Sequence, residues 1–336
     1  MRCLPDLRNI YQSSSVALPL HATAGAPIHF LIRVHDQNGN ELCLRPDLTI
    51  ASCLRYLNEK IKGKAKVHYY GQAFRKNLNK TDPIIRNQIG FEIIGSKNEK
   101  KDDKQIVETS LKSLSKFNYS SGNLVIGNVE IFKLLLNKLD IPKRWRLRLQ
   151  RHFWRESYFN DLLKRLETNS DVDPTIVEID KKKFQKMLKG DQSRQIAGRS
   201  VNEILTRFNN KIKDPRRAKK GRNVSKIIKE FLKINCPIDQ AAKKLNSFFI
   251  KNKVNLRIEN EYFPITKRKI SKLDIKYSAS FGRELEYYTG MVFKIIVKFK
   301  SKKINLINGG RFDNLISDLG SSKKIPAVGA AINLNN

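Results

Sequence analysis

The stretch that decides the fold of this chain reads Phe281-Gly-Arg-Glu-Leu-Glu-Tyr-Tyr-Thr-Gly-Met-Val-Phe293. It leads into an apolar run, Met291 to Phe299, that is rich in β-branched residues and typical of a strand in the body of a sheet. Arg283, Tyr287 and Tyr288 stand directly before that strand, on a rigid platform that suits contacts to a small ligand. The same residues also fit a tyrosine-rich strand end with ordinary cross-strand packing.

Length and composition predict a globular protein with one large or two medium domains. The 336 residues can bury a sizeable core, and 40% of them are hydrophobic. No apolar run reaches membrane-spanning length and no cleavable leader opens the sequence, so we expect a cytoplasmic protein without membrane contact. The cysteines lack metal-ligand spacing, and we expect reduced thiols, no metal and no cofactor. They are Cys3, Cys43, Cys53 and Cys236.

The formal net charge of +34 would ordinarily suggest a polyanionic partner such as nucleic acid. Lysine is spread over the whole chain, however, with local runs only at Lys181–Lys183 and Pro215–Arg222. Asn and Ile are also abundant, as in chains from compositionally biased genomes. We therefore attribute the charge to composition and expect no nucleic-acid partner, with attraction of a functional anion as the alternative.

Residues 30–130 predict the first part of a sheet domain. Asn38-Gly39 is a strong signal for the turn of a hairpin. A helix is expected over Thr49–Lys62, where apolar residues recur on one face. Lys66–Arg75 and Gln88–Ile94 then predict a long antiparallel strand pair joined by a polar loop.

Residues 131–254 differ in character, because basic and apolar residues alternate there with helical spacing. We interpret them as a helical insertion whose one short strand is Thr175–Glu178. Strand-forming sequence returns in residues 255–336, the second part of the core. Residues 1–29 carry no clear period and are interpreted as an irregular N-terminal segment, diverged or truncated. Strands before and after a helical block predict an α+β fold, an antiparallel sheet flanked by helices.

Four sets of short motifs occur in an order and spacing that resemble one family. They are Leu44-Arg-Pro-Asp-Leu-Thr49; Tyr70-Gly-Gln-Ala-Phe-Arg75 with Gln88-Ile-Gly-Phe-Glu92; Gly282 to Gly290; and Gly309-Gly-Arg-Phe-Asp-Asn314 with Ala327-Val-Gly-Ala-Ala331. Together they span about residue 30 to 334 and resemble the histidyl-tRNA synthetase-like family of class II aminoacyl-tRNA synthetase folds. The resemblance implies that family's antiparallel sheet, interrupted by the helical insertion.

The resemblance also implies a histidine-binding pocket without catalytic residues of its own. An amino acid brings an ammonium, a carboxylate and an imidazole, which acidic, amide, hydroxyl and arginine side chains can bind. Glu286 departs from the Asp that the family carries before the tyrosine pair. A relic network in which these groups satisfy one another is the alternative. The matching positions are Asp47, Thr49, Arg75, Gln88, Glu92, Arg283, Tyr287 and Tyr288.

By the same resemblance, adenylation would need an arginine after the last glycine-rich strand and arginines in the loop of the second motif. This sequence has Asn335 at the first place and Lys76, Lys80 and a displaced Arg86 around the second. A lysine does not replace the planar fork of an arginine, so we expect no adenylation. No tRNA-reading domain follows Asn336, so we expect no anticodon recognition.

Within this family the residues favour a non-catalytic regulatory subunit of ATP phosphoribosyltransferase, the first enzyme of histidine biosynthesis. The resemblance implies a short-form catalytic subunit as partner, L-histidine as regulatory ligand, and a homodimer within a hetero-oligomer. The alternative is a histidyl-tRNA synthetase-like enzyme that lacks the anticodon-binding domain. A basic RNA-binding module is a third possibility, and it predicts RNA affinity that falls steeply with salt.

Overall fold

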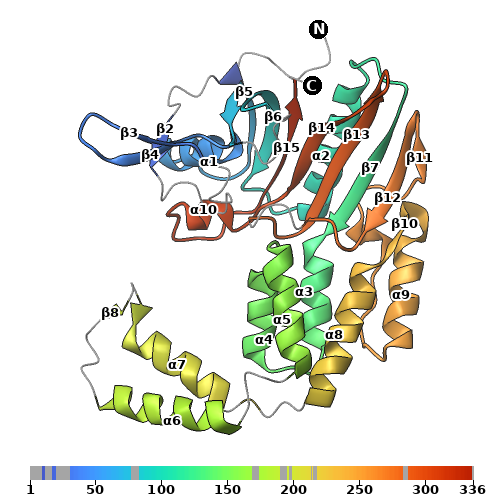
Figure 1. The fold of residues 1–336 in the computed structure, drawn as a ribbon. Helices are drawn as coiled ribbons and strands as arrows, with labels where there is room; N and C mark the ends of the chain where they lie inside the picture. Colours follow the sequence, from blue (N-terminus) through green and yellow to red (C-terminus); the bar gives the residue numbers. More distant parts are fainter. Residues whose placement is uncertain are drawn as a thin grey trace. The chain divides into compact units, whose positions relative to one another are not determined.

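The computed structural model describes residues 10–11, 17–19, 31–76, 83–168, 174–189, 195–196, 199–212, 214, 218–282 and 287–334 (Figure 1). Among the positions discussed above, Cys3, Lys80, Pro215, Arg283, Glu286, Asn335 and Asn336 lie outside these residues. The chain divides into two compact units. Unit 1 consists of Met1–Phe132, Ile234–Phe248 and Arg257–Asn336, and unit 2 consists of Lys133–Lys233 and Phe249–Leu256.

Unit 1 is built on a ten-stranded sheet, whose main path runs β1-β5-β6-β15-β14-β13-β7-β12-β10, with β11 paired to β12. All of these pairings are antiparallel except β1 with β5 and β12 with β7. The strands are β1 (Ile10–Tyr11), β5 (Ala65–Phe74), β6 (Ile85–Ile94), β7 (Ser121–Asn128), β10 (Asn235–Pro237), β11 (Lys269–Ile270), β12 (Leu273–Ser278), β13 (Met291–Phe299), β14 (Lys302–Arg311) and β15 (Ala327–Asn333).

A second, three-stranded sheet and several helices complete unit 1. The small sheet has the order β2-β4-β3. Helix α2 packs against β6, β14 and β15, and α1 packs against α10. The elements are β2 (Ala17–Pro19), β3 (Arg33–His35), β4 (Glu41–Leu44), α1 (Thr49–Asn58), α2 (Glu99–Leu114), α9 (Ala241–Lys251), α10 (Leu315–Asp318) and the short 3-10 helices η5 (Ile238–Gln240) and η6 (Asn260–Tyr262). The first residues of α3 (Val129–Lys138) also belong to this unit.

The predicted antiparallel sheet flanked by helices is confirmed. The apolar run that predicted a strand forms β13 over Met291–Phe299, between β14 and β7 in the body of the sheet. The hairpin expected at Asn38-Gly39 joins β3 to β4, and Gly39 has the positive φ of 78° that such a turn favours. Residues 1–29 do contain two short strands, β1 and β2, although no period in the sequence indicated them.

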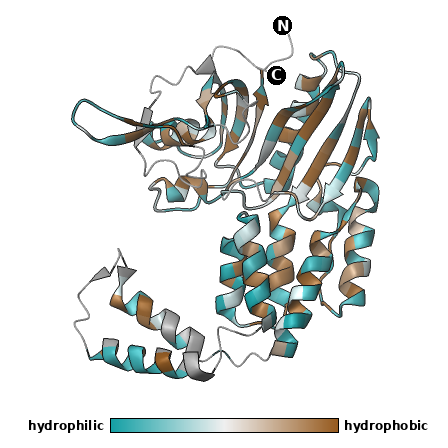
Figure 2. Cartoon of the chain, viewed as in Figure 1, coloured by the Kyte–Doolittle hydropathy of each residue, from teal (hydrophilic) through white to brown (hydrophobic). Residues whose placement is uncertain are grey.

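An apolar cluster fills the space between α1, α10 and the end of the sheet near β6. Ile50, Cys53 and Ile94 are fully buried in it, and Tyr287 and Phe312 pack there as well. Figure 2 shows the strands of the sheet as largely hydrophobic. The buried thiols of Cys43, Cys53 and Cys236 are unpaired, as expected. This cluster is what holds α1 against the strand that carries the candidate site.

Unit 2 is helical. Its elements are α3, α4 (Lys143–Arg151), α5 (Glu156–Thr168), α6 (Pro174–Leu188), β8 (Gln195–Ile196), β9 (Arg199–Ser200), α7 (Val201–Ile212) and α8 (Ala218–Leu232). The short strand predicted at Thr175–Glu178 is wrong, because these residues form the first turns of α6. A local run of β-branched residues is compatible with either structure, and the helix packs against α7.

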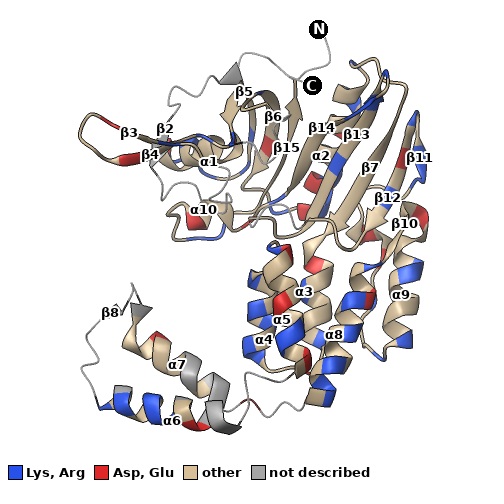
Figure 3. Cartoon of the chain, in the orientation of Figure 1, with Lys and Arg blue, Asp and Glu red and all other residues tan. Residues whose placement is uncertain are grey.

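A buried polar contact fixes α4 in unit 2. Asp214 accepts hydrogen bonds from Arg144 Nε at 3.0 Å and from Trp145 Nε1 at 3.0 Å. Trp145 is fully buried and Arg144 lies over its ring. Figure 3 shows Lys and Arg distributed over the helices and strands of both units rather than gathered on one element. None of the helices in the described residues is both long and apolar enough to span a membrane.

Candidate functional site

The site lies where β5, β6 and β15 meet the first turn of α1. Thr49 begins α1, and the preceding loop carries Asp47. Glu92 projects from β6, a strand that lies between β5 and β15 and is buried along most of its length. Because strand residues two apart share a face, Gln88 and Glu92 lie on the same side of β6. Sheet pairing therefore sets the spacing of these polar groups.

A buried carboxylate is the centre of the site. Glu92 is 1% exposed, and its Oε1 accepts hydrogen bonds from Thr49 Oγ1 at 2.9 Å and from Tyr69 OH at 3.0 Å. Its Oε2 accepts no hydrogen bond from any described residue. Burial raises the pKa of Glu92 to about 8, against the two hydroxyl donors that lower it, and nearby Asp47 raises it further. Burial thus favours the protonated form of Glu92 in the ligand-free protein, whereas a cation beside Oε2 would favour the ionised form.

Gly329 of β15 makes room for that carboxylate. It stands opposite Glu92 in the strand register, and a Cβ atom there would lie 1.3 Å from Glu92 Oε2 and 2.9 Å from the backbone oxygen of Phe91. A side chain at this position would push the carboxylate away from its two hydroxyl donors. The absence of a side chain at Gly329 is thus part of how Glu92 is placed.

Replacing Gly329 by Ala should therefore destabilise the protein by roughly 1–3 kcal/mol, the usual cost of overpacking. Urea unfolding measures this loss. Gly71→Ala is the matched control on β5, since its nearest neighbour would be the end of the Arg45 side chain at 3.3 Å. Adding Glu92→Ala to the Gly329→Ala variant removes the clashing atoms and should restore part of the loss. A Gly329→Ala variant as stable as Gly71→Ala would contradict this placement of Glu92.

Asp47 and Arg75 form the charged side of the site. Asp47 is 6% exposed and its Oδ1 accepts a hydrogen bond from the backbone N–H of Ile50 at 2.9 Å, within the first turn of α1. Burial raises the pKa of Asp47, while the guanidinium of Arg75 lowers it. Arg75 Nε donates to the backbone oxygen of Pro46 at 2.7 Å, which ties the end of β5 to the loop before α1. The Arg75 guanidinium thus favours the ionised form of Asp47, against the effect of burial.

The tyrosine pair lies directly before β13. The rings of Tyr287 and Tyr288 meet edge-on with centroids 4.9 Å apart, and Phe312 packs edge-on against Tyr287. Burial raises the pKa of the Tyr287 hydroxyl, with smaller effects from Tyr288, Asp47, Arg75 and Glu92. Tyr287 also packs in the same buried cluster as Ile50 and Cys53 of α1, the helix that begins at Thr49. Gly310 allows the close packing, since a Cβ there would lie 2.7 Å from the Tyr288 ring.

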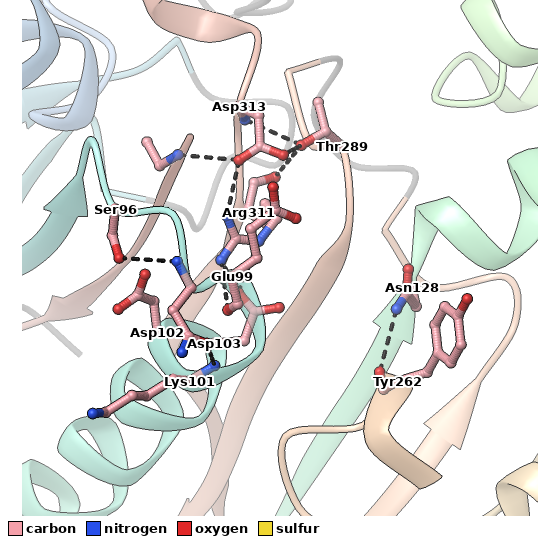
Figure 4. A network of polar contacts seen from close by, with 12 residues as sticks. Ser96, Glu99, Lys101, Asp102, Asp103, Asn128, Tyr262, Thr289, Arg311 and Asp313 are labelled. Atoms are coloured by element: carbon pink, nitrogen blue, oxygen red, sulfur yellow. Dashed lines mark hydrogen bonds and ion pairs between the residues drawn. The ribbon is translucent and has the colours of Figure 1, made fainter. Parts of the chain in front are cut away.

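An arginine network locks the backbone that follows the tyrosine pair (Figure 4). Arg311 is 4% exposed, and its guanidinium binds Asp103 at 2.6 Å, Asp313 at 2.9 Å and the backbone oxygen of Glu99 at 2.9 Å. Asp313 in turn accepts a hydrogen bond from Thr289 Oγ1 at 3.2 Å. The network therefore connects α2, β14 and the residue next to Tyr288.

Burial outweighs the attraction of Arg311 at Asp103 and raises the pKa of Asp103 to about 6. The N-terminus of α2, the helix that carries Asp103, is stabilised by a cap and by acidic side chains. Asn98 caps α2 by accepting a hydrogen bond from the Lys101 N–H at 3.1 Å, and acidic residues occupy the first turn. This stable N-terminus of α2 therefore holds Asp103 beside Arg311, the last residue of β14.

The structure brings most of the predicted site residues together, with Gln88 at the far end of the group. Thr49 and Glu92 are in contact, Asp47 and Arg75 interact, and Tyr287 lies beside them with Tyr288. Gln88 shares the face of β6 but bonds to Asn333 instead, and the predicted Arg283 lies outside the described residues.

Sequence reasoning assigned no site role to three residues, Tyr69, Arg311 and Asn333, although Arg311 lies in the quoted motif Gly309 to Asn314. Tyr69 carried a signal, since it is the first of two tyrosines in a predicted strand next to a recognised motif. Asn333 carried none, because its partner is 245 residues away in the sequence.

The chemistry available at the site is recognition of hydrogen-bond donors. Glu92 Oε2 and Gln88 Oε1 are buried acceptors without a partner in the described residues, and unpaired buried acceptors are costly. An ammonium group would satisfy them and would favour the ionised form of Glu92. Within the described residues, no group of three or more His, Cys, Asp or Glu side chains is placed to hold a metal ion.

Solved structures with similar folds place the chain in a class. A structure titled an ATP phosphoribosyltransferase regulatory subunit/histidyl-tRNA synthetase from Bacillus halodurans aligns with a TM-score of 0.56 at 17% identity, over 95% of this chain and 71% of that one. A histidine–tRNA ligase subunit from Alicyclobacillus acidocaldarius aligns with a TM-score of 0.50 at 18% identity, over 95% and 84%. These structures have the class II synthetase-like fold, a mostly antiparallel sheet with flanking helices, and this chain shares it. The chain belongs to the histidyl-tRNA synthetase family, whose sequence model matches residues 16–336.

Curated relatives match this sequence over most of its length. The chain is 29% identical to the ATP phosphoribosyltransferase regulatory subunit of Brucella anthropi over 314 residues, which cover 88% of this chain and 83% of the relative. It is 28% identical to the protein of the same name from Brucella ovis, again over 88% of this chain and 83% of the relative.

Proposed function

We propose that this chain is a non-catalytic regulatory subunit of ATP phosphoribosyltransferase that acts in histidine biosynthesis in the cytoplasm. The observation that carries the proposal is the similarity to relatives of that name over 88% of the chain, which includes both units. The partner is a short-form catalytic subunit, and the chain works as a homodimer within a hetero-oligomer.

The site supports L-histidine as the regulatory ligand. The acceptors Glu92 Oε2 and Gln88 Oε1 suit the ammonium and imidazole N–H groups, and Arg75 brings a cation for the carboxylate. Histidine would regulate by linkage. If it prefers one state of the hetero-oligomer, it shifts the population toward that state by the difference in affinity.

Mixing the purified chain with the short catalytic subunit encoded by the same genome tests the function. We expect slow condensation of ATP with phosphoribosyl pyrophosphate by the catalytic subunit alone, a clear gain on adding this chain, and loss of that gain with L-histidine. The two proteins should also elute together in size-exclusion chromatography. No complex and no gain in rate would reject the proposal. ATP–pyrophosphate exchange that depends on histidine, in this chain alone, would instead favour a synthetase-like enzyme.

Variants at the tyrosine pair test whether histidine acts through this site. Tyr288→Phe removes one hydroxyl beside Tyr287, and Arg283→Ala removes the cation that the sequence motif places before the pair. Each should raise the histidine concentration for half inhibition by roughly tenfold, the value of one lost hydrogen bond to a charged ligand. Complex formation should be unchanged. Tyr70→Phe, a tyrosine 42% exposed on β5, is the matched control. Unaltered inhibition curves in both variants would place the histidine sensor elsewhere.

A further inference from the structure

Two side-chain amides meet between β6 and β15, at the far end of the candidate site. Gln88 and Asn333 stand opposite each other in the strand register, and they are 4% and 8% exposed. Gln88 Nε2 donates a hydrogen bond to Asn333 Oδ1 at 2.8 Å. An amide carries one acceptor and one donor end, so the way this pair is turned decides what Gln88 offers to a ligand.

The orientation of the pair is fixed from outside. Asn333 Nδ2 donates to the backbone oxygen of Asn305 at 3.2 Å. A backbone oxygen can only accept, so the end of Asn333 that faces it must be the NH2 group. The other end, Oδ1, then faces Gln88 and can only accept as well. Gln88 must therefore present its NH2 group to Asn333, which leaves Oε1 as its remaining functional end.

The remaining end of Gln88 is an acceptor that no described residue satisfies. Glu92 lies on the same face of β6 and also keeps one oxygen, Oε2, without a hydrogen bond from the described residues. Gln88 thus offers an acceptor, and Glu92 offers a second one from the same face of the strand once it is ionised, the form that a bound ammonium favours. A ligand that brings an ammonium gains from both acceptors, whereas a ligand without donors leaves Gln88 Oε1 unsatisfied.

We infer that Asn333 is a specificity-determining positioning residue, which holds the oxygen of Gln88 toward the ligand and so selects a ligand with an ammonium group. This inference rests on the proposed function where it takes L-histidine as that ligand. Asn333 acts through Gln88 and does not itself touch the ligand. Without Asn333 the Gln88 amide can turn and present its NH2 group, so the site would distinguish donors from acceptors less well.

Isothermal titration of the full chain with two ligands tests the inference. The ligands are L-histidine and 3-(imidazol-4-yl)propionate, which has the same ring and carboxylate but no ammonium. The parent chain should prefer histidine by about a hundredfold, because a buried unpaired acceptor is penalised when the ammonium is missing. Asn333→Leu keeps the side-chain volume and should weaken histidine binding by roughly tenfold. Asn333→Leu should leave the affinity for 3-(imidazol-4-yl)propionate nearly unchanged, so the ratio of the two affinities becomes smaller.

A double-mutant cycle separates positioning from general damage to the sheet. If Asn333 acts through Gln88, then Gln88→Leu combined with Asn333→Leu should bind histidine no more weakly than Gln88→Leu alone. Asn308→Leu is the matched control on β14, since Asn308 accepts from Asn305 Nδ2 and does not contact Gln88. Asn333→Ala provides a second variant if the leucine side chain prevents folding. Each variant is first compared with the parent by thermal unfolding.

The outcomes separate the inference from the proposed function. An undiminished preference for histidine in Asn333→Leu and Asn333→Ala, or additive losses in the cycle, would overturn the inference even if the chain activates the catalytic subunit. A parent chain that fails to prefer histidine would overturn it too. A narrowed preference in a chain that does not activate the catalytic subunit would support the role of Asn333 and reject the regulatory function alone.

Discussion

Arg311→Met should lower the free energy of unfolding by about 3–5 kcal/mol, the usual effect of removing one partner from a buried ion pair. Arg311 is 4% exposed and binds Asp103, Asp313 and the backbone oxygen of Glu99. Methionine fills much of the space but leaves two largely buried carboxylates without their cation. The loss is measured by urea unfolding, followed by tryptophan fluorescence and far-UV circular dichroism.

A surface arginine provides the control for this prediction. Arg33 pairs with Glu41 at 2.8 Å, a distance close to those made by Arg311, but the two side chains are 52% and 42% exposed. Exposed pairs of this kind contribute under about 1 kcal/mol, so Arg33→Met should be nearly neutral. If Arg311→Met does not fold, Asp103→Asn tests the same network with a smaller change. If Arg311→Met and Arg33→Met lowered the free energy of unfolding equally, burial would not be the reason that the Arg311 network stabilises the protein.

Glu92→Gln should make the ligand-free protein more stable than the parent at alkaline pH and about equally stable at acidic pH. The pKa of Glu92 is raised from 4.5 to about 8 in the folded protein, chiefly by burial. Between these two values the folded chain keeps a proton that the unfolded chain has lost. The free energy of unfolding of the parent therefore falls as pH rises through this window and is level above it. Each pKa unit corresponds to ~1.4 kcal/mol, so the fall amounts to a few kcal/mol.

Urea unfolding at about pH 5 and about pH 9 measures the difference in free energy of unfolding between the parent and Glu92→Gln. Its change with pH reports how many more protons the folded parent binds than the unfolded parent. Glutamine keeps an oxygen that Thr49 and Tyr69 can donate to, so the neutral variant retains the hydrogen bonds of the protonated side chain. Glu108→Gln, on the exposed side of α2, is the control that should not alter the pH dependence. A constant gap between parent and Glu92→Gln across this range would show that Glu92 is ionised in the folded protein at neutral pH.

The strands of the core could be predicted from local sequence because their burial leaves a direct pattern. Met291–Phe299 is a mainly apolar run, interrupted only by Lys294 and Lys298, and it forms a strand paired on both sides, with β14 and β7. The motifs also predicted that Thr49 and Glu92 belong to one site, and the structure adds the hydrogen bond between them. Gln88 shows the limit of that inference, because its hydrogen-bond partner is Asn333, which was not a member of the predicted set.

The parts that sequence did not reveal depend on contacts between distant segments. Arg311 was recognised as part of a motif, but nothing near it in sequence indicates Asp103, which lies 208 residues earlier. Tyr69 joins the site because β5 is in register with β6, with Tyr69 opposite Gly90. The strand expected at Thr175–Glu178 was wrong for a related reason. A few β-branched residues do not decide between helix and strand without their tertiary partners.

The pairing of β6 with β15 has a consequence for the order of events during synthesis. Glu92 leaves the ribosome before unit 2, whereas Gly329 and Asn333, which stand opposite its strand, are made after unit 2. Unit 2 lies between them in sequence and finds its helix partners within its own span. Domains tend to fold as they emerge from the ribosome. The helices of unit 2 can therefore form while the edge of β6 that later pairs with β15 is still unpaired. A nascent chain arrested before Ala327 should therefore bind a folding chaperone through that exposed strand and release it once β15 is added.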